Sequence, residues 1–151
     1  MTSIFEPAVR EDLVRRLATL SPDTPARWGK FNATRMLAHV NDGLRMATGE
    51  LPVRPRGRLL RNAIVRYLVI YVFPFPKGAP TAPELLARGA SADGAEFSAE
   101  RATFAKLLAD IGAQSERVTW PDHPAFGAMS RKDWSVLGYK HVHHHFTQFG
   151  V

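Results

Sequence analysis

The sequence contains no cysteine among its 151 residues. Disulfide bonds, thiolate nucleophiles, and zinc or iron–sulfur sites with cysteine ligands are therefore excluded. Any metal ion has to be held by nitrogen or oxygen atoms, so histidine and the acidic residues are the candidate ligands.

The sequence also lacks a long apolar run. Its longest, Tyr67 to Phe75, has about half of the roughly 20 apolar residues that a membrane-spanning helix needs, and Pro74 interrupts it. Charged residues between Glu6 and Asp12 occupy the place where a secretory signal needs an uninterrupted apolar stretch. We therefore expect a soluble cytoplasmic protein with no membrane partner.

Acidic residues are absent from Leu51 to Pro83. The same stretch holds a cluster of arginines: Arg54, Arg56, Arg58, Arg61 and Arg66. With a net charge of +6, this basic patch is suited to an acidic partner such as nucleic acid or an anionic membrane. However, Tyr67 and Tyr71 have core-like spacing and do not alternate with the arginines as base-stacking residues would. Nucleic acid is therefore a less favoured partner than a solvated or interface-forming arginine face.

Four stretches show the apolar spacing of amphipathic helices. They are Pro7 to Leu20, the stretch that ends at Thr48, Ala95 to Ile111, and the stretch from Ser130 to Phe149. Asn32 or Thr34 is predicted to cap the second helix at its start, and Gly49 to close it. Gly112 is predicted to cap the helix from Ala95 to Ile111 in the same way as Gly49. Ser130 and Asp133 form a capping-box pattern before the last helix.

A further helical segment, Gly57 to Phe73, is rich in arginine at its start and apolar at its end. Prolines from Pro74 to Pro83 end it, and the chain as far as Gly94 is expected to form a long proline-rich loop. No stretch alternates with a period of two, so no sheet is expected. A length of 151 residues with 45% hydrophobic content suits one core. The sequence thus predicts a single all-α domain, residues 1–151, built as a helical bundle with an additional helical segment.

The chain ends in a histidine-rich stretch that holds His141, His143, His144 and His145. Val142 interrupts the run and an amphipathic continuation follows it, which is not the pattern of an expression tag. Residues four apart on a helix share one face and lie about 6 Å apart along its axis. His141 and His145 are therefore expected to approach one ion, with His144 as the competing partner, while His143 points away.

A useful metal site needs a third ligand, because two histidines on one helix chelate weakly. Sites in helical bundles draw such ligands from facing helices. His39 is the only histidine in another predicted helix, so it is the natural third ligand. A histidine near an apolar stripe is more often a hydrogen-bonded core residue than a ligand, and that interpretation of His39 stays open. Taken together, His39, His141 and His145 are the predicted metal ligands.

Three other polar residues are candidates for supporting roles. Asp42 follows His39 by three positions and is expected to be solvated, or else to orient a histidine, act as a fourth ligand or serve as a base. His123 lies in a loop, as a surface residue, a capping residue or part of a pocket mouth. Gln148 follows His145 by one turn and either bonds a ligand or caps the helix end.

The sequence resembles the DinB-like superfamily, in particular a subfamily catalogued as a domain of unknown function. The resemblance rests on Trp28-Gly29-Lys30, Met36-Leu37-Ala38-His39, Pro74-Phe75-Pro76-Lys77-Gly78, His123-Pro124-Ala125-Phe126-Gly127 and His141 through Gly150. It implies a four-helix bundle, often dimeric, with a divalent ion on three histidines that correspond to His39, His141 and His145. The position of His145 before Phe146-Thr147-Gln148 fits the second histidine of the terminal pair, and Tyr67 to Phe73 is the candidate face of a homodimer.

Three neutral imidazoles leave coordination positions open, which suits catalysis. Zinc or nickel is the favoured ion, and iron or manganese also fits histidine ligands. By analogy with related DinB-like proteins, the leading hypothesis is a metal-dependent thiol S-transferase or a hydrolase-like enzyme. Its partner would be a low-molecular-weight thiol such as glutathione, mycothiol or bacillithiol, attracted by the basic patch. The alternative is a non-catalytic metal-binding or stress-associated module, because a fold does not prove a reaction.

Overall fold

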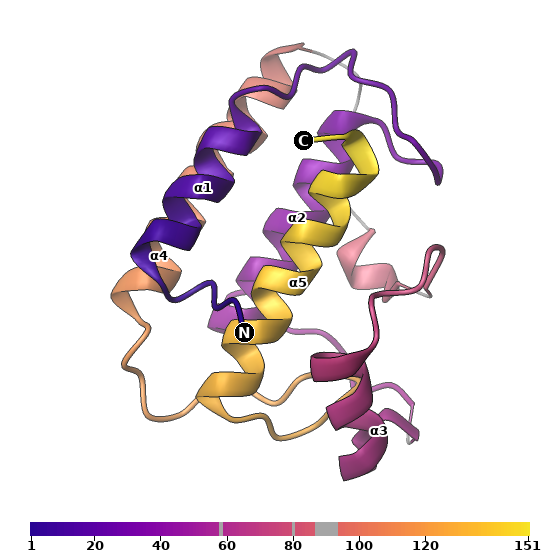
Figure 1. Cartoon of the computed structure of the whole chain (residues 1–151), viewed down its shortest axis with the longest axis vertical. Coiled ribbons are helices and arrows are strands. Elements are labelled where there is room, and N and C mark those ends of the chain that lie inside the picture. The colour runs from indigo at the N-terminus through magenta and orange to yellow at the C-terminus, as the bar shows by residue number, and fades with distance from the viewer. Residues whose placement is uncertain (58, 80, 87–93) are drawn as a thin grey trace.

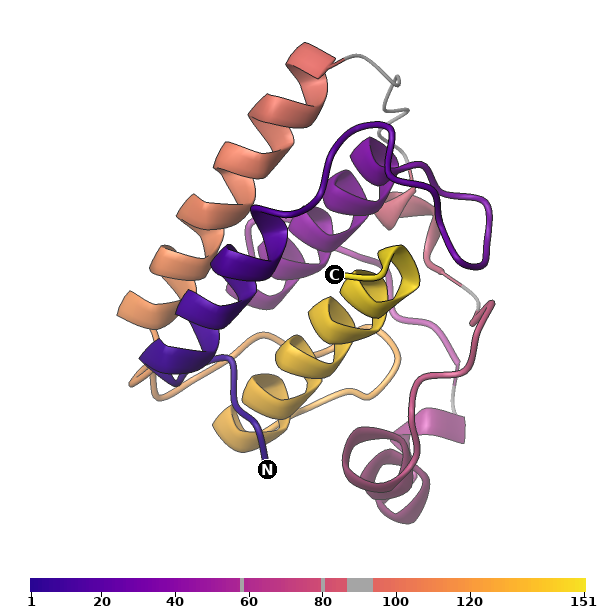
Figure 2. The same cartoon turned by 45° about the horizontal axis from the view of Figure 1, so that its top comes forward.

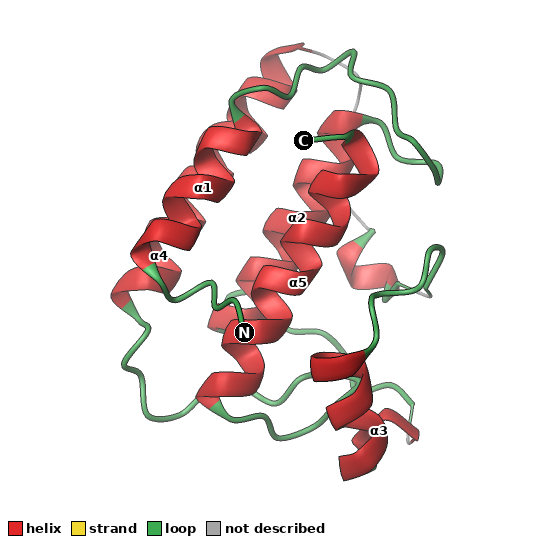
Figure 3. Ribbon diagram, in the orientation of Figure 1, coloured by secondary structure: helices red, strands yellow, loops and turns green. Residues whose placement is uncertain are grey.

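The computed structural model describes residues 1–57, 59–79, 81–86 and 94–151. Within these residues the chain forms five α-helices and no strand (Figure 3). The helices are α1 (Pro7–Leu17), α2 (Ala33–Thr48), α3 (Ala63–Tyr67), α4 (Gly94–Ala113) and α5 (Arg131–Phe149). The predicted all-α fold is confirmed. Among the described residues, no helix combines the length and the apolar character needed to cross a membrane.

Helices α1, α2, α4 and α5 pack side by side as a bundle (Figures 1 and 2). Helix α2 contacts both α4 and α5, and α1 contacts α4. Helices α2 and α5 run in opposite directions, so the chain entering α2 meets the end of α5, where the backbone N–H of Arg27 donates to Gln148 O at 2.8 Å. The buried core between the four helices includes Leu13, Leu17, Met36, Leu37, Val40, Phe104, Leu108 and Phe146.

The two helices that carry the histidines begin and end where local sequence signals place them. The side chain of Asn32, rather than Thr34, caps α2 by accepting a backbone N–H at 2.8 Å. Gly49 closes α2 with a φ of 89°, a conformation that glycine adopts without steric cost. Ser130 and Asp133 form the predicted capping box of α5. Both helices are thus fixed at their ends by their own local sequence.

Two predicted helix ends were wrong. Helix α1 stops at Leu17, because the N–H groups after it turn back onto carbonyls three residues earlier, and Leu20 is buried outside the helix. Gly112 does not cap α4, which continues to Ala113. A Cβ at Gly112 would lie 2.6 Å from Cζ of Arg10. The glycine therefore makes room for the Arg10 guanidinium, whose Nη1 donates to Phe5 O at 2.6 Å.

The additional helical segment predicted for residues 57–73 is present and is divided into three short pieces. It consists of a 3₁₀ turn (Leu59–Arg61), α3, and a π-helical turn (Leu68–Val72). The Asn62 side chain accepts from the N–H groups of Ile64 and Val65 at 3.0 and 3.3 Å, which ends the first turn and starts α3. Lys140 of α5 donates from Nζ to Val69 O and Ile70 O at 2.6 and 3.1 Å. This lysine fixes the π-helical turn to α5.

The predicted proline-rich loop contains a short 3₁₀ turn, Pro83–Leu85. Residues 80 and 87–93 of that loop, and Arg58 of the basic patch, lie outside the described residues. The described residues between 51 and 86 leave the bundle on the side of α2 and α5, as Figures 1 and 2 show. A second buried cluster lies where this excursion and the loop before α5 meet the bundle, and it includes Ala47, Ile70, Phe126, Met129, Trp134 and Leu137.

Candidate metal centre

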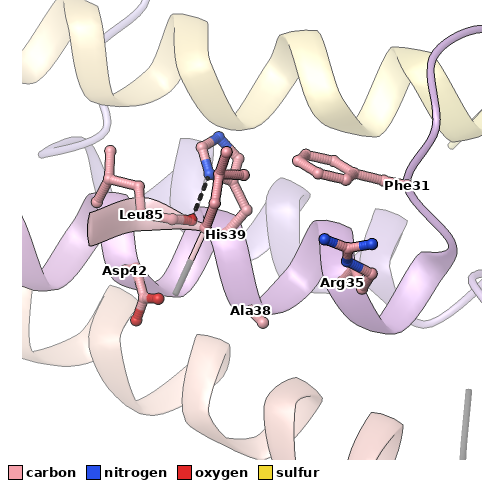
Figure 4. Close-up of a pocket in the computed structure, with 7 residues that line it drawn as sticks. Phe31, Arg35, Ala38, His39, Asp42 and Leu85 are labelled. Carbon is pink, nitrogen blue, oxygen red and sulfur yellow. Dashed lines mark hydrogen bonds between the residues drawn. The ribbon is translucent and has the colours of Figure 1, made fainter. Parts of the chain in front are cut away.

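His39 lies in the middle of α2 with 6% of its surface exposed. Its Nδ1–H donates to the backbone oxygen of Leu85 at 3.2 Å, a contact drawn in Figure 4. A neutral imidazole that is protonated on Nδ1 carries its lone pair on Nε2. That Nε2 lies 3.0 Å from Nε2 of His141. The 3₁₀ turn of the proline-rich loop thus sets the tautomer of His39 and turns its lone pair toward α5.

His141 and His145 lie on consecutive turns of α5 and face His39. One nitrogen from each of the three rings lies within 4.8 Å of the others. Nitrogen atoms bound tetrahedrally to one zinc ion are roughly 3.3 Å apart, given bond lengths of about 2.0–2.1 Å. Small side-chain movements would therefore bring all three into coordination range. The structure brings together the three histidines that the sequence predicted.

Gln148 orients the third histidine. The Nδ1–H of His145 donates to Gln148 Oε1 at 2.9 Å, and Gln148 Nε2 donates to Trp28 O at 2.7 Å. A ligating histidine is commonly held in this way through its other nitrogen, which fixes both the ring and the tautomer. Gln148 therefore bonds a candidate ligand and does not cap the helix. Because it bonds Nδ1 of His145, the lone pair of that ring is on Nε2.

All three rings are neutral at neutral pH. Burial lowers the pKa of His39, and burial together with the neighbouring histidines lowers that of His141 well below its usual value. Burial, then repulsion from His39, lowers the pKa of His145 to about 3. Neutral imidazole is the form that binds a metal ion. The triad therefore requires no deprotonation of an imidazolium before it can act as a ligand set at neutral pH.

Gly43 is part of the site and was not recognised as such from the sequence. A Cβ at this position would lie 2.8 Å from Cε1 of His141 and 3.0 Å from its Nδ1. The absence of a side chain in α2 therefore lets the His141 ring lie against the helix backbone. The available signal was a glycine inside a helix, one turn after His39, at a position where helix propensity disfavours it.

The other histidines of α5 have different surroundings. His144 is not part of the group of three; its ring lies 5.9 Å from Trp28 and 6.0 Å from Phe75, measured between centroids. His143 is exposed and stacks on Tyr139, and it faces away from the triad as predicted. The geometry thus favours His145 over His144, in agreement with the resemblance.

Asp42 is not solvated as expected. It is 4% exposed, and its Oδ1 lies 3.1 Å from Nη1 of Arg45. Figure 4 shows its carboxylate and the imidazole of His39 leaving α2 in different directions. Because Nδ1 of His39 is bonded to Leu85, Asp42 is not the group that orients this histidine. The described donor atoms that meet at the centre are those of the three histidines.

A cavity of about 730 Å³ opens beside the triad. All three histidines and His144 line it, and so does His123 from the loop before α5. His123 is therefore neither a surface residue nor a helix cap: it belongs to the wall of a pocket. Burial lowers the pKa of this imidazole to about 4, which keeps it neutral. The candidate metal centre thus faces a space large enough for a small molecule.

The basic patch is partly used within the fold. Arg56 pairs with Glu84 at 3.5 Å, and Nη1 of Arg66 donates to Ala128 O at 2.7 Å. Tyr67 and Tyr71 contact each other, with ring centroids 5.2 Å apart, so they are not spaced as separate stacking platforms. Exposed apolar side chains in the same region include Leu59, Ile64, Tyr67, Val72 and Phe73. The homodimer predicted on this face stays a prediction, as does the preference against nucleic acid.

Comparison with known proteins leaves the function of this site open. No curated protein and no solved structure matches the chain. One family model matches residues 8–150, nearly the whole chain, including all three histidines of the triad. Its description is "Protein of unknown function (DUF1569)". The chain therefore belongs to the family of unknown function DUF1569.

Proposed function

We propose that this chain is a divalent-metal-binding protein in which His39, His141 and His145 hold the ion at the wall of the cavity. The observation that carries the proposal is the convergence of three neutral imidazoles whose donor atoms lie within 4.8 Å of one another. The hydrogen bonds from His39 to Leu85 and from His145 to Gln148 support it, because both leave Nε2 as the atom with the lone pair.

The donor set fits a borderline metal ion. Three imidazole nitrogens without a thiolate suit zinc or nickel best, and also accept iron or manganese. Three ligands leave coordination positions open toward the cavity, as in catalytic zinc sites and unlike closed structural ones. An ion held there would supply a Lewis acid able to lower the pKa of a coordinated thiol or water. The chain's own residues would set the ligand geometry and enclose the small molecule.

The reaction that we favour is a metal-dependent transfer to or from a low-molecular-weight thiol, with a hydrolase-like reaction as its variant. Support for it comes from the resemblance to the DinB-like superfamily and from the open ligand set. The cationic side chains of Lys30 and Arg56 line the cavity and would attract the carboxylates of glutathione, mycothiol or bacillithiol. Addition of such a thiol to cobalt-loaded protein should change the visible absorption spectrum, and an unchanged spectrum at millimolar thiol would argue against this reaction.

Metal binding is tested by zinc titration of untagged, metal-free protein with a calorimeter. We expect one ion per chain, and an affinity at least about 100-fold lower in each of His39→Ala, His141→Ala and His145→Ala, since each removes a ligand. The matched controls are on the same helix: His143→Ala, on the exposed side, and His144→Ala, the competing partner in the sequence. Unchanged affinity in all three triad variants, or loss only in His144→Ala, would refute the proposed ligand set.

A non-catalytic module is the second candidate, because the triad joins α2 to α5. An ion that binds only the folded chain raises its stability in proportion to the logarithm of its concentration over Kd. Chelation should then lower the melting temperature of the parent protein and leave that of His39→Ala unchanged. A catalytic site predicts the same shift, and turnover or a spectral response to thiol separates the two candidates.

A further inference from the structure

The cavity beside the triad is lined mainly by apolar side chains. Large ones that contribute to it are Leu60, Val69, Phe75, Phe126, Trp134 and Leu137. Its volume of about 730 Å³ lies within the range of small-molecule sites. An apolar lining forms few hydrogen bonds with a ligand. The free energy of binding becomes more favourable as more apolar surface of the ligand is removed from water. The body of a fitting ligand is therefore apolar.

The charged residues at the cavity are cationic. Among the described residues that line it, Lys30 and Arg56 carry charge, and neither Asp nor Glu takes part. The side chain of Arg56 is 49% exposed, and its Nη2 lies 3.5 Å from Oε2 of Glu84, a geometry in which an ion pair contributes little. Arg56 can therefore turn to a competing anion. This charge distribution favours an anionic ligand.

His123 lines the same cavity and carries a hydrogen-bond donor whose position on the ring is fixed. Its Nδ1 accepts the backbone N–H groups of Ala125 and Phe126 at 3.1 and 3.3 Å, so the proton of the neutral ring is on Nε2. The ring lies against Phe126 and Trp134, with centroids 4.6 and 5.3 Å away. In the described part of the chain its Nε2–H has no hydrogen-bond partner.

Arg56 and His123 occupy the same part of the cavity wall. The backbone N–H of Arg56 donates to Pro124 O at 2.9 Å, which fixes the arginine next to the loop that holds His123. The neutral N–H donor of His123 and the cation of Arg56 thus come from neighbouring loops. The three histidines of the triad, in contrast, lie on α2 and α5. A carboxylate fits this pair, since charge-assisted hydrogen bonds are among the strong ones.

We propose that the cavity binds an apolar carboxylate. Its carboxylate accepts a hydrogen bond from Nε2–H of His123 and faces Arg56, and its hydrocarbon or aromatic body fills the cavity. Both oxygens of a carboxylate are acceptors, so one anion can take both contacts. Binding of this ligand requires no metal ion. Its identification as the small molecule on which the triad acts rests on the proposed function.

The test uses decanoate as the probe and metal-free protein. All three tryptophans of the chain, Trp28, Trp120 and Trp134, line the cavity, so their intrinsic fluorescence reports its occupancy. We expect a saturable fluorescence change with decanoate below its micelle concentration. Decanol, which has the same chain length without the charge, should bind about tenfold or more weakly, because a hydrogen bond to a charged group is lost.

Variants locate the carboxylate. His123→Phe keeps an aromatic ring between its neighbours and removes the donor, so it should weaken decanoate about tenfold and leave decanol nearly unchanged. His123→Gln retains a donor and acceptor and should restore part of the affinity. His143→Phe, on the exposed side of α5, is the matched control and should change neither ligand. No saturation with decanoate, or equal loss of both ligands in His123→Phe, would overturn the proposal.

Zinc binding measured on the same samples separates this proposal from the proposed function. Decanoate binding in a parent protein that binds no zinc would refute the metal centre and leave the carboxylate site standing. Zinc binding without decanoate binding would do the reverse. Correct folding of His123→Phe is verified by its unchanged zinc affinity, or, if the parent binds none, by its unchanged affinity for decanol.

Discussion

Two walls of the cavity differ in construction. One, the helical wall, consists of α2 and α5 and carries His39, His141 and His145 on regular helices. The other, the irregular wall, consists of the described parts of residues 51–86 with the loop 120–127, and it carries Arg56 and His123. Hydrogen bonds that join the two walls include the one from Nδ1–H of His39 to Leu85 O and those from Lys140 to the π-helical turn.

The two walls place different kinds of groups at the cavity. Regular helices hold side chains at fixed spacing, which suits ligands that must meet at one ion within tenths of an ångström. Loops and short turns supply backbone carbonyls and N–H groups in directions that a helix cannot offer, as Leu85 does for His39 and Ala125 for His123. The helical wall therefore carries the candidate metal ligands, and the irregular wall orients one of them, His39, and shapes the ligand space.

A large effect is expected at low pH, and His123 of the irregular wall contributes to it. The pKa of His123 is about 4 in the folded chain because of burial, against 6.5 for an unperturbed histidine. Between these values the unfolded chain binds the proton and the folded chain does not, so the free energy of unfolding falls as the pH falls from 6.5 to 4. The loss attributable to this group approaches about 3 kcal/mol.

Urea denaturation at several pH values measures this loss. His123→Gln keeps an acceptor for the loop N–H groups but does not titrate, so its unfolding free energy should depend less on pH than that of the parent. His143→Gln is the control on the exposed side of α5 and should retain most of the dependence. Equal pH dependence in the parent and His123→Gln would contradict a buried, neutral His123.

The next effect tests the helical wall. Gly43→Ala places a Cβ within 2.8 Å of the His141 ring, which must move away. We expect zinc affinity to fall about 10- to 100-fold, the size typical for residues that position a ligand. Gly112→Ala is the matched control, because it also adds a methyl group inside a helix but meets the flexible guanidinium of Arg10. Equal zinc affinity in the parent and Gly43→Ala would mean that His141 is not held by this contact.

The helical wall was predictable because its signals are local. Asn32, Gly49, Ser130 and Asp133 mark helix ends through their own side chains or backbone freedom, and a spacing of four places two histidines on one face. His39 was chosen for a different reason, as the remaining histidine in a predicted helix. The structure confirms that it meets the pair, which periodicity alone did not establish.

The irregular wall was not predictable in the same way. The stretch before Pro74 indicated a helical segment, but not that Asn62 starts α3 within it or that Lys140, far along the sequence, fixes the π-helical turn. The hydrogen bond between Leu85 and His39 is a tertiary contact, and the one between His123 and Ala125 involves a backbone N–H. Contacts of these kinds leave no pattern in the sequence. The roles of Gly43 and Gly112 could not be predicted either, because each glycine makes room for a side chain from another helix.

The smallest effect tests whether the two walls are separable. Asn62→Ala removes the side chain that accepts the N–H groups of Ile64 and Val65, at a cost of about 1 kcal/mol. Because α3 lies outside the bundle (Figure 1), we expect this cost to appear as faster hydrogen exchange of the amides in residues 63–72, with zinc affinity unchanged. Asn32→Ala removes the equivalent cap of α2 and should instead lower the free energy of global unfolding by a similar amount, because α2 belongs to the core. If Asn62→Ala weakened zinc binding as strongly as Gly43→Ala, the irregular wall would have to set the ligand geometry along with the helices, and the division between the walls would fail.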